Sequence, residues 1–121
     1  MLRVEISMDP GIIGDATMRY LIDLLPDIVS KVMSIPGHPD GELVPGDIEI
    51  LVQEFGKWDV NTNPLEIVIH ASYFPARANN LDERQKEISD GIKNCVPLGI
   101  KWYVCVFLLY ASFQNFGPEE G

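Results

Sequence analysis

The sequence predicts an α+β fold: a two-layer sandwich in which a four-stranded mixed sheet carries two helices on one face. Each half of the chain contains two stretches in which apolar and polar residues alternate, and a stretch with helical spacing lies between them. Two parallel strands joined by a crossover helix form a right-handed unit. The repeated strand–helix–strand order therefore indicates a duplicated βαβ element.

The first βαβ unit is predicted over residues 1–60. Residues 2–8 alternate as a strand with one buried face, and Asp15 is a candidate N-cap for the amphipathic helix that follows. Pro26 lies inside this helical pattern and is expected to kink the helix or break it into two pieces. After a loop rich in proline and glycine, a second strand is expected from Ile48 onward.

The second unit is predicted over residues 64–117. Alternation from Leu65 to Ser72 indicates a third strand, and Asn80 with Glu83 forms a capping-box variant at the start of the second helix. Residues 101–113 are apolar on both faces. We therefore expect the last strand to be central, or to be covered by helices on one side and by another subunit on the other.

Length and composition indicate one globular domain over residues 1–121, with a short tail at 118–121. The chain is 46% hydrophobic and 22% charged, with a formal net charge of −9. This charge disfavours nucleic acid and anionic lipid surfaces, because both require neutralisation by Lys and Arg. No basic leader or membrane-length apolar run is present, and Cys95 and Cys105 lack metal-site spacing. We expect a cytoplasmic protein with no nucleic-acid partner, no membrane, no metal and no cofactor.

A resemblance to a known family rests on the second half of the chain. Pro64 precedes the third strand, Arg77 lies in the turn that follows it, and "LDERQKEI" opens the helix. This half resembles half of a tautomerase-superfamily protein, the fold type of macrophage migration inhibitory factor and the 5-carboxymethyl-2-hydroxymuconate isomerases. A ferredoxin-like arrangement shares the same order of elements and is the alternative architecture.

The resemblance implies specific chemistry at the amino terminus. Members of this superfamily typically expose an N-terminal proline whose amine shuttles protons between keto and enol forms. Residue 2 of this chain is instead Leu2, so the group in that place would be the α-amino group of Met1. Pro64 is internal, and its amide nitrogen is no base. Arg77 lies where the family places an arginine that binds the substrate carboxylate.

Four further residues are candidates for ligand binding. Arg3 is either an anion ligand or an outward strand residue paired with Glu49 or Glu66. His70 either titrates near neutral pH or is structural. Tyr73 and Tyr110 line a pocket in one interpretation and belong to the core or to an interface in the other.

The resemblance therefore predicts a tautomerase-like homotrimer that binds a small carboxylate or keto acid and isomerises it between keto and enol forms. Met1 would act as proton shuttle and Arg77 as carboxylate anchor. Two alternatives stay open at this point: a non-catalytic binding or assembly protein that keeps the fold without the proline, and a ferredoxin-like ligand-sensing domain.

Overall fold

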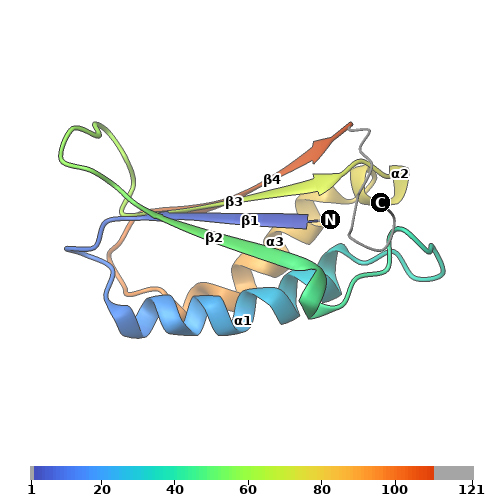
Figure 1. The fold of residues 1–121 in the computed structure, drawn as a ribbon, viewed down its shortest axis with the longest axis horizontal. Helices are drawn as coiled ribbons and strands as arrows, with labels where there is room; N and C mark the ends of the chain where they lie inside the picture. Colours follow the sequence, from blue (N-terminus) through green and yellow to red (C-terminus); the bar gives the residue numbers. More distant parts are fainter. Residues whose placement is uncertain (1, 111–121) are drawn as a thin grey trace, which may run out of the picture.

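A computed structural model describes residues 2–110 of the chain. It contains one four-stranded sheet and two main helices that lie on the same face of the sheet (Figure 1). In chain order the elements are β1 (Leu2–Met8), α1 (Asp15–Met33), a 3-10 turn η1 (Pro45–Asp47), β2 (Ile48–Glu54), β3 (Leu65–Ser72), α2 (Pro75–Ala78), α3 (Leu81–Ile92), a second 3-10 turn η2 (Lys93–Cys95) and β4 (Trp102–Leu109).

The strand order is β2-β1-β3-β4. β1 runs parallel to β2, and β3 runs parallel to β4. The two halves meet where β1 and β3 pair antiparallel at the centre of the sheet. Each crossover pair is thus adjacent and the halves do not interleave, which confirms the tautomerase arrangement and excludes the ferredoxin-like one.

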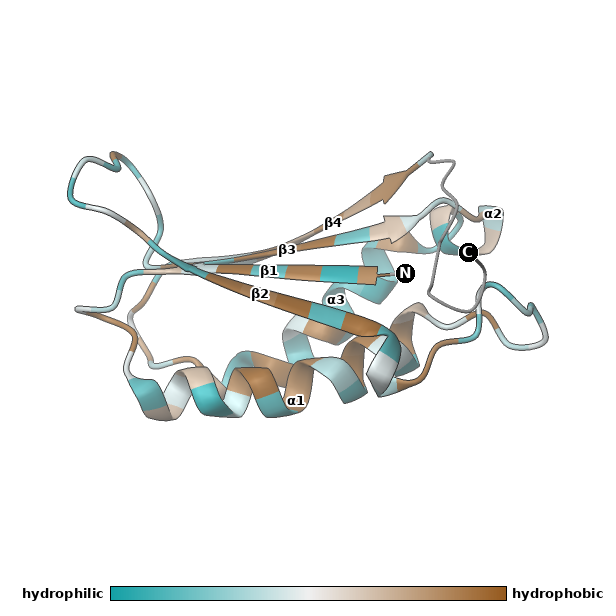
Figure 2. Cartoon of the chain, viewed as in Figure 1, coloured by the Kyte–Doolittle hydropathy of each residue, from teal (hydrophilic) through white to brown (hydrophobic). Residues whose placement is uncertain are grey.

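The core lies between the sheet and the two helices. Along β1 and β3 every second residue is buried, as the alternation predicts, and Figure 2 shows apolar and polar segments alternating along β1. α1 and α3 contribute the opposing apolar stripe. The fully buried side chains of this core include Leu2, Val4, Ile6, Leu21, Leu25, Val29, Met33, Leu65, Ile67, Ile69, Ile88 and Ile92.

α1 differs from its prediction at two points. The N-cap is Gly14 and not Asp15. Asp15 is the first helical residue, where its negative carboxylate interacts favourably with the positive end of the helix dipole. The helix continues through Pro26 to Met33, so the predicted break is wrong. Five buried residues on one face, together with the buried Ser30, hold both halves of α1 against the sheet, and this packing outweighs the missing backbone donor.

The predicted central position of the last strand is also wrong. β4 is an edge strand that pairs only with β3 among the described strands. Its residues Trp102, Val104 and Val106 face the core, whereas Tyr103 and Phe107 point to the side that no helix covers. One apolar face of β4 is thus covered by the core, and the large side chains of its other face are exposed in the single chain. The predicted residues 111–113 of this strand lie outside the described part of the chain.

Within residues 2–110, no helix is both long enough and apolar enough to cross a bilayer.

Candidate functional site

The start of β1 and the end of β3 meet at one end of the sheet. Arg3 is paired with His70 in the antiparallel register, so the first residues of the chain lie beside the last residues of β3. Tyr73 and the short helix α2, which contains Arg77, follow directly, and Figure 1 shows α2 at the same end of the sheet as the start of β1. We call this region the sheet end. Met1, the predicted catalytic residue, lies outside the described residues.

Arg77 is buried at the sheet end instead of standing in an exposed turn. Its side chain is 2% exposed, its Nε donates to the Met33 carbonyl and its Nη1 to the Ser72 carbonyl, each at 2.9 Å. The guanidinium also lies 4.9 Å from the ring centroid of Phe74. Burial, and then the nearby positive charge of Arg84, lower the pKa of Arg77 below its ordinary value. Arg77 therefore ties the end of α1 to the end of β3.

Arg84 is a second arginine of this region that the sequence analysis did not single out. Its Nη1 donates to the Val32 carbonyl at 2.7 Å, and its Nε donates to the Asn80 side-chain oxygen at 2.7 Å. The last carbonyls of a helix lack intrahelical donors and carry the negative end of the helix dipole, so two guanidinium groups suit the end of α1. The spacing from the cap residue Asn80 to Arg84 is the only sequence signal for this contact.

Asn80 occupies the predicted N-cap position of α3, but its side chain makes no capping hydrogen bond. Its side-chain oxygen accepts from Arg84, so the position was predicted correctly and the capping-box bonding was not.

Aromatic side chains gather beside these arginines. Tyr73 and Tyr110 stack with ring centroids 4.5 Å apart, and a hydrogen bond between the two side chains raises the pKa of Tyr110. His38, from the loop after α1, meets Phe74 edge-on at 4.7 Å. The structure thus brings together Tyr73 and Tyr110, two of the predicted ligand-binding residues, whereas the aromatic ring beside Arg77 is that of Phe74.

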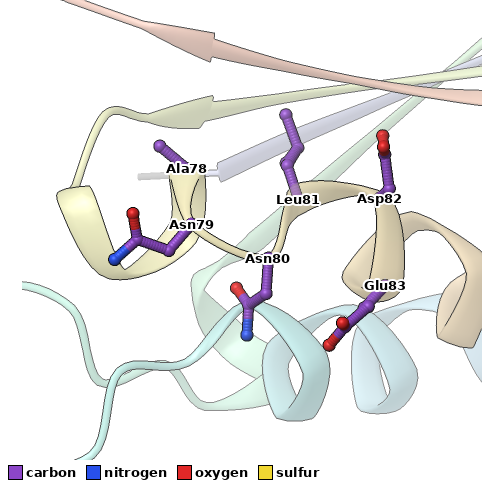
Figure 3. Close-up of a pocket in the computed structure, with 6 residues that line it drawn as sticks. All are labelled: Ala78, Asn79, Asn80, Leu81, Asp82 and Glu83. Atoms are coloured by element: carbon purple, nitrogen blue, oxygen red, sulfur yellow. The ribbon is translucent and has the colours of Figure 1, made fainter.

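A shallow depression of about 430 Å³ lies at the junction of α2 and α3, open to solvent. Figure 3 shows that Ala78, Leu81 and Asp82 point toward the sheet, whereas Asn79, Asn80 and Glu83 point away from it. The carboxylates of Asp82 and Glu83 line this depression. It is therefore less suited to an anion than the surroundings of Arg77 and Arg84.

The side chains of Arg3 and His70 point to the other face of the sheet, which the described helices leave uncovered. We call this the open face. By register and alternation it is formed by Arg3, Glu5 and Ser7 of β1, Glu49, Leu51 and Gln53 of β2, Glu66, Val68, His70 and Ser72 of β3, and Tyr103, Cys105, Phe107 and Leu109 of β4.

The charged residues of the open face form a row. Arg3 Nε donates to Glu49 Oε1 at 2.6 Å, which confirms the predicted cross-strand pairing with Glu49. Arg3 Nη1 lies 3.9 Å from Glu5, whose other oxygen lies 3.6 Å from His70 Nε2. The His70 ring also stacks on Phe107, with 5.8 Å between the ring centroids. His70 therefore has partners that only the strand register reveals.

Glu66 is held at the other end of the same face. It accepts a hydrogen bond from the Asn63 backbone at 3.2 Å, and its register partner on β4 is Tyr103. Burial, and then the adjacent Glu66 carboxylate, raise the pKa of Tyr103.

No group of three or more His, Cys, Asp or Glu side chains within residues 2–110 is arranged to hold a metal ion. Both cysteines are free thiols and half-buried.

Comparison with solved structures identifies the fold. The chain is similar to a malonate semialdehyde decarboxylase inhibited by 3-bromopropiolate, with a TM-score of 0.60 and 13% identity over 97% of this chain and 88% of that one. It is similar to a fused 4-OT in its symmetric trimer, with a TM-score of 0.61 and 14% identity over 96% and 92%. It is also similar to a macrophage migration inhibitory factor-like protein from Entamoeba histolytica, with a TM-score of 0.60 and 11% identity over 96% and 95%.

The protein has the tautomerase-superfamily fold. No protein-family profile matches the sequence, and no curated protein matches it. The similarity to the solved structures therefore concerns the fold.

Proposed function

We propose that this protein binds a small carboxylate or keto acid at the sheet end and isomerises it between keto and enol forms. The observation that supports this most is the register of β1 against β3, which brings the start of β1 beside the end of β3, after which Tyr73 and Arg77 follow in the chain. In a chain of net charge −9, two neighbouring guanidinium groups provide a local positive potential that attracts a carboxylate. The amine of Met1 is the proton shuttle in this proposal.

A specific observation favours a second candidate, a non-catalytic binding or assembly protein. Two donors of Arg77 are already engaged by backbone carbonyls, and Leu2 stands where the enzymes of this fold type carry proline. An arginine that holds two backbone carbonyls has less capacity to bind a substrate carboxylate in two-point fashion.

Mass spectrometry of the mature amino terminus, combined with an enol–keto assay on phenylenolpyruvate, separates the two candidates. Turnover above the solvent rate, abolished when acetylation converts the amine into a non-basic amide, supports the enzyme. Turnover equal to the solvent rate with Met1 present overturns it.

The variant Leu2→Pro sharpens this test. Proline is tolerated as the first residue of a strand, and it allows removal of the initiator Met, so the variant presents the secondary amine. Activity gained in Leu2→Pro but absent from the natural chain shows a site complete except for its base, which supports the second candidate. Leu2→Ala is the matched control, since it shortens the same buried side chain without supplying a secondary amine.

The assembly proposed for this protein is a homotrimer through the open face. Leu51, Tyr103, Phe107 and Leu109 are large apolar residues on this face, each between 39% and 48% exposed. Such a surface is typical of an interaction site. One of the solved structures with this fold is a symmetric trimer. We place the protein in the cytoplasm because its two cysteines are free thiols.

A further inference from the structure

The loop that joins β2 to β3, residues 55–64, presents two large apolar side chains to solvent. Trp58 is 84% exposed and Val60 is 76% exposed, and neither packs against the core. We call residues 55–64 the arm. Tryptophan is enriched at protein–protein interfaces, where it is among the residues that contribute most to binding. The arm therefore has the side chains of a contact surface.

The arm is closed by its own hydrogen bonds. At its base, backbone hydrogen bonds of 2.9 Å join its two ends to Met8 and Asp9, where β1 ends. At its tip, the Asp59 carboxylate accepts from the Gly56 N–H at 2.6 Å, and the Gly56 carbonyl accepts from the Asp59 N–H at 3.1 Å. Trp58 lies inside this turn, so little backbone freedom remains to be lost when its ring is buried by a partner.

The arm lies on the same side of the sheet as the open face. In Figure 1 it stands at the upper left, and the sheet lies between it and α1. It begins directly after β2 and ends directly before β3, two strands that contribute to the open face. The arm thus extends the open face, at the end of the sheet opposite to the sheet end.

The open face combines apolar surface with an excess of negative charge. Glu5, Glu49 and Glu66 are its three carboxylates, and Arg3 is the one residue of permanent positive charge among its described residues. Its large apolar side chains are between 39% and 48% exposed. A surface that fits this face would carry apolar side chains and a cation.

The arm carries both of these groups. Lys57 Nζ lies 5.4 Å from the centroid of the Trp58 ring, so a cation and a large apolar ring stand together. Within residues 2–110, no carboxylate lies within 4 Å of Lys57 Nζ. The carboxylate of the arm itself, Asp59, is held by the Gly56 N–H. Lys57 is therefore available to a carboxylate of another surface.

Three identical chains close into a ring only through a heterologous interface, in which one surface of a copy contacts a different surface of the next. Each chain needs two unlike surfaces, and the open face and the arm are two such surfaces with complementary charge. We infer that the arm of each copy packs on the open face of the next, with Trp58 as its apolar anchor and Lys57 beside the carboxylates. This inference rests on the homotrimer proposed above.

Fluorescence of the full chain tests whether assembly buries Trp58. The chain has two tryptophans, so Trp102→Phe leaves Trp58 as the only one. Sedimentation velocity across a concentration series gives the half-assembly concentration, at which half the chains are assembled. Above it, the emission of Trp58 should shift to shorter wavelengths, and most of its quenching by acrylamide should be lost.

Two other results of this experiment are distinguishable. A trimer in which Trp58 keeps the emission and quenching of an exposed side chain overturns only the present inference. A chain that is monomeric at every concentration overturns the proposed trimer as well.

A second variant tests the same contact with Trp102 left in place. Trp58→Ser should raise the half-assembly concentration at least about tenfold, because loss of a buried anchor residue weakens binding by this factor or more. Tyr20→Ser is the matched control, since Tyr20 is an aromatic residue of α1 that is 61% exposed, and it should leave this concentration unchanged. An unchanged value in Trp58→Ser, or an equal rise in Tyr20→Ser, overturns the inference.

Lys57→Glu tests the charge complementarity. It should raise the half-assembly concentration at low salt, and the effect should shrink at high salt, because salt screens exposed charges. Lys86→Glu makes the same change of charge at an exposed position of α3 and should have no effect. If Lys57→Glu assembled like the natural chain at low salt, the arm would not lie on the open face.

Discussion

Arg77 illustrates how a residue predicted as a ligand is used inside the fold. From the sequence, an arginine in a turn after a strand is exposed and free to bind a carboxylate. In the structure α2 folds back, and the guanidinium reaches the last turn of α1, 44 residues away in the chain. Local sequence patterns relate residues only a few positions apart. The hydrogen bonds from Arg77 to the Met33 and Ser72 carbonyls therefore could not be predicted from the sequence.

Substitution of Arg77 should therefore destabilise the protein. In Arg77→Met, the Met33 and Ser72 carbonyls lose a charged donor in a buried place, and hydrogen bonds of this kind contribute roughly 1.5–3 kcal/mol each. We expect the free energy of unfolding to fall by about 2–4 kcal/mol in urea titrations.

Arg19→Met is the control, because Arg19 is exposed on α1 and its loss should change stability by less than about 0.5 kcal/mol. If Arg77→Met had the same urea midpoint of unfolding as the natural protein but no longer bound a carboxylate, Arg77 would be a ligand residue and its structural assignment would be incorrect.

At the scale of elements, the sequence predicted most of what the structure contains. β1 and β3 follow directly from alternation, because both are flanked by strands on each side and buried on one face. β2 and β4 were located correctly, but the central position expected for β4 was wrong, since edge positions depend on strand order. The expected alternative of a helix broken at Pro26 was wrong, because local propensity ignores the packing of α1 against the sheet.

Pro26 should accordingly be a site where stability can be gained. Alanine in the helix interior is about 3 kcal/mol more favourable than proline, and its N–H can donate to the carbonyl four residues earlier. We expect Pro26→Ala to raise the free energy of unfolding by roughly 1–3 kcal/mol and the melting temperature with it.

Pro36→Ala serves for comparison, because Pro36 lies in the loop after α1 and supports no helix. There the change should be neutral or destabilising by up to about 1 kcal/mol, through greater freedom of the unfolded chain. Lower stability of Pro26→Ala would mean that α1 requires the conformation that proline imposes.

For the whole molecule, the two layers were predictable, but the row of charged residues on the open face was not. The apolar face of each helix finds the sheet within one chain, and periodicity is sufficient to show this. The row from Glu49 through Arg3 and Glu5 to His70 becomes visible only when the register aligns three strands. Register depends on pairing between residues distant in the chain, which a single sequence does not display.

β2 offers a direct test of whether the proposed trimer forms through the open face. Leu51 and Val52 are neighbours in the chain with nearly equal exposure, 44% and 46%, but they point to opposite faces. Leu51→Glu places a further carboxylate on the open face, where negative charge is already in excess. Because one buried unpaired charge costs several kcal/mol, the concentration at which half the chains are assembled should rise at least about tenfold. Val52→Glu adds the same charge on the helix side and should leave the midpoint unchanged.

Both sites are exposed in the single chain, so neither variant should unfold it, and circular dichroism verifies this. If Val52→Glu dissociated the trimer and Leu51→Glu did not, the interface would lie on the helix side or along the outer edge of β2, and the open face would be free for another partner.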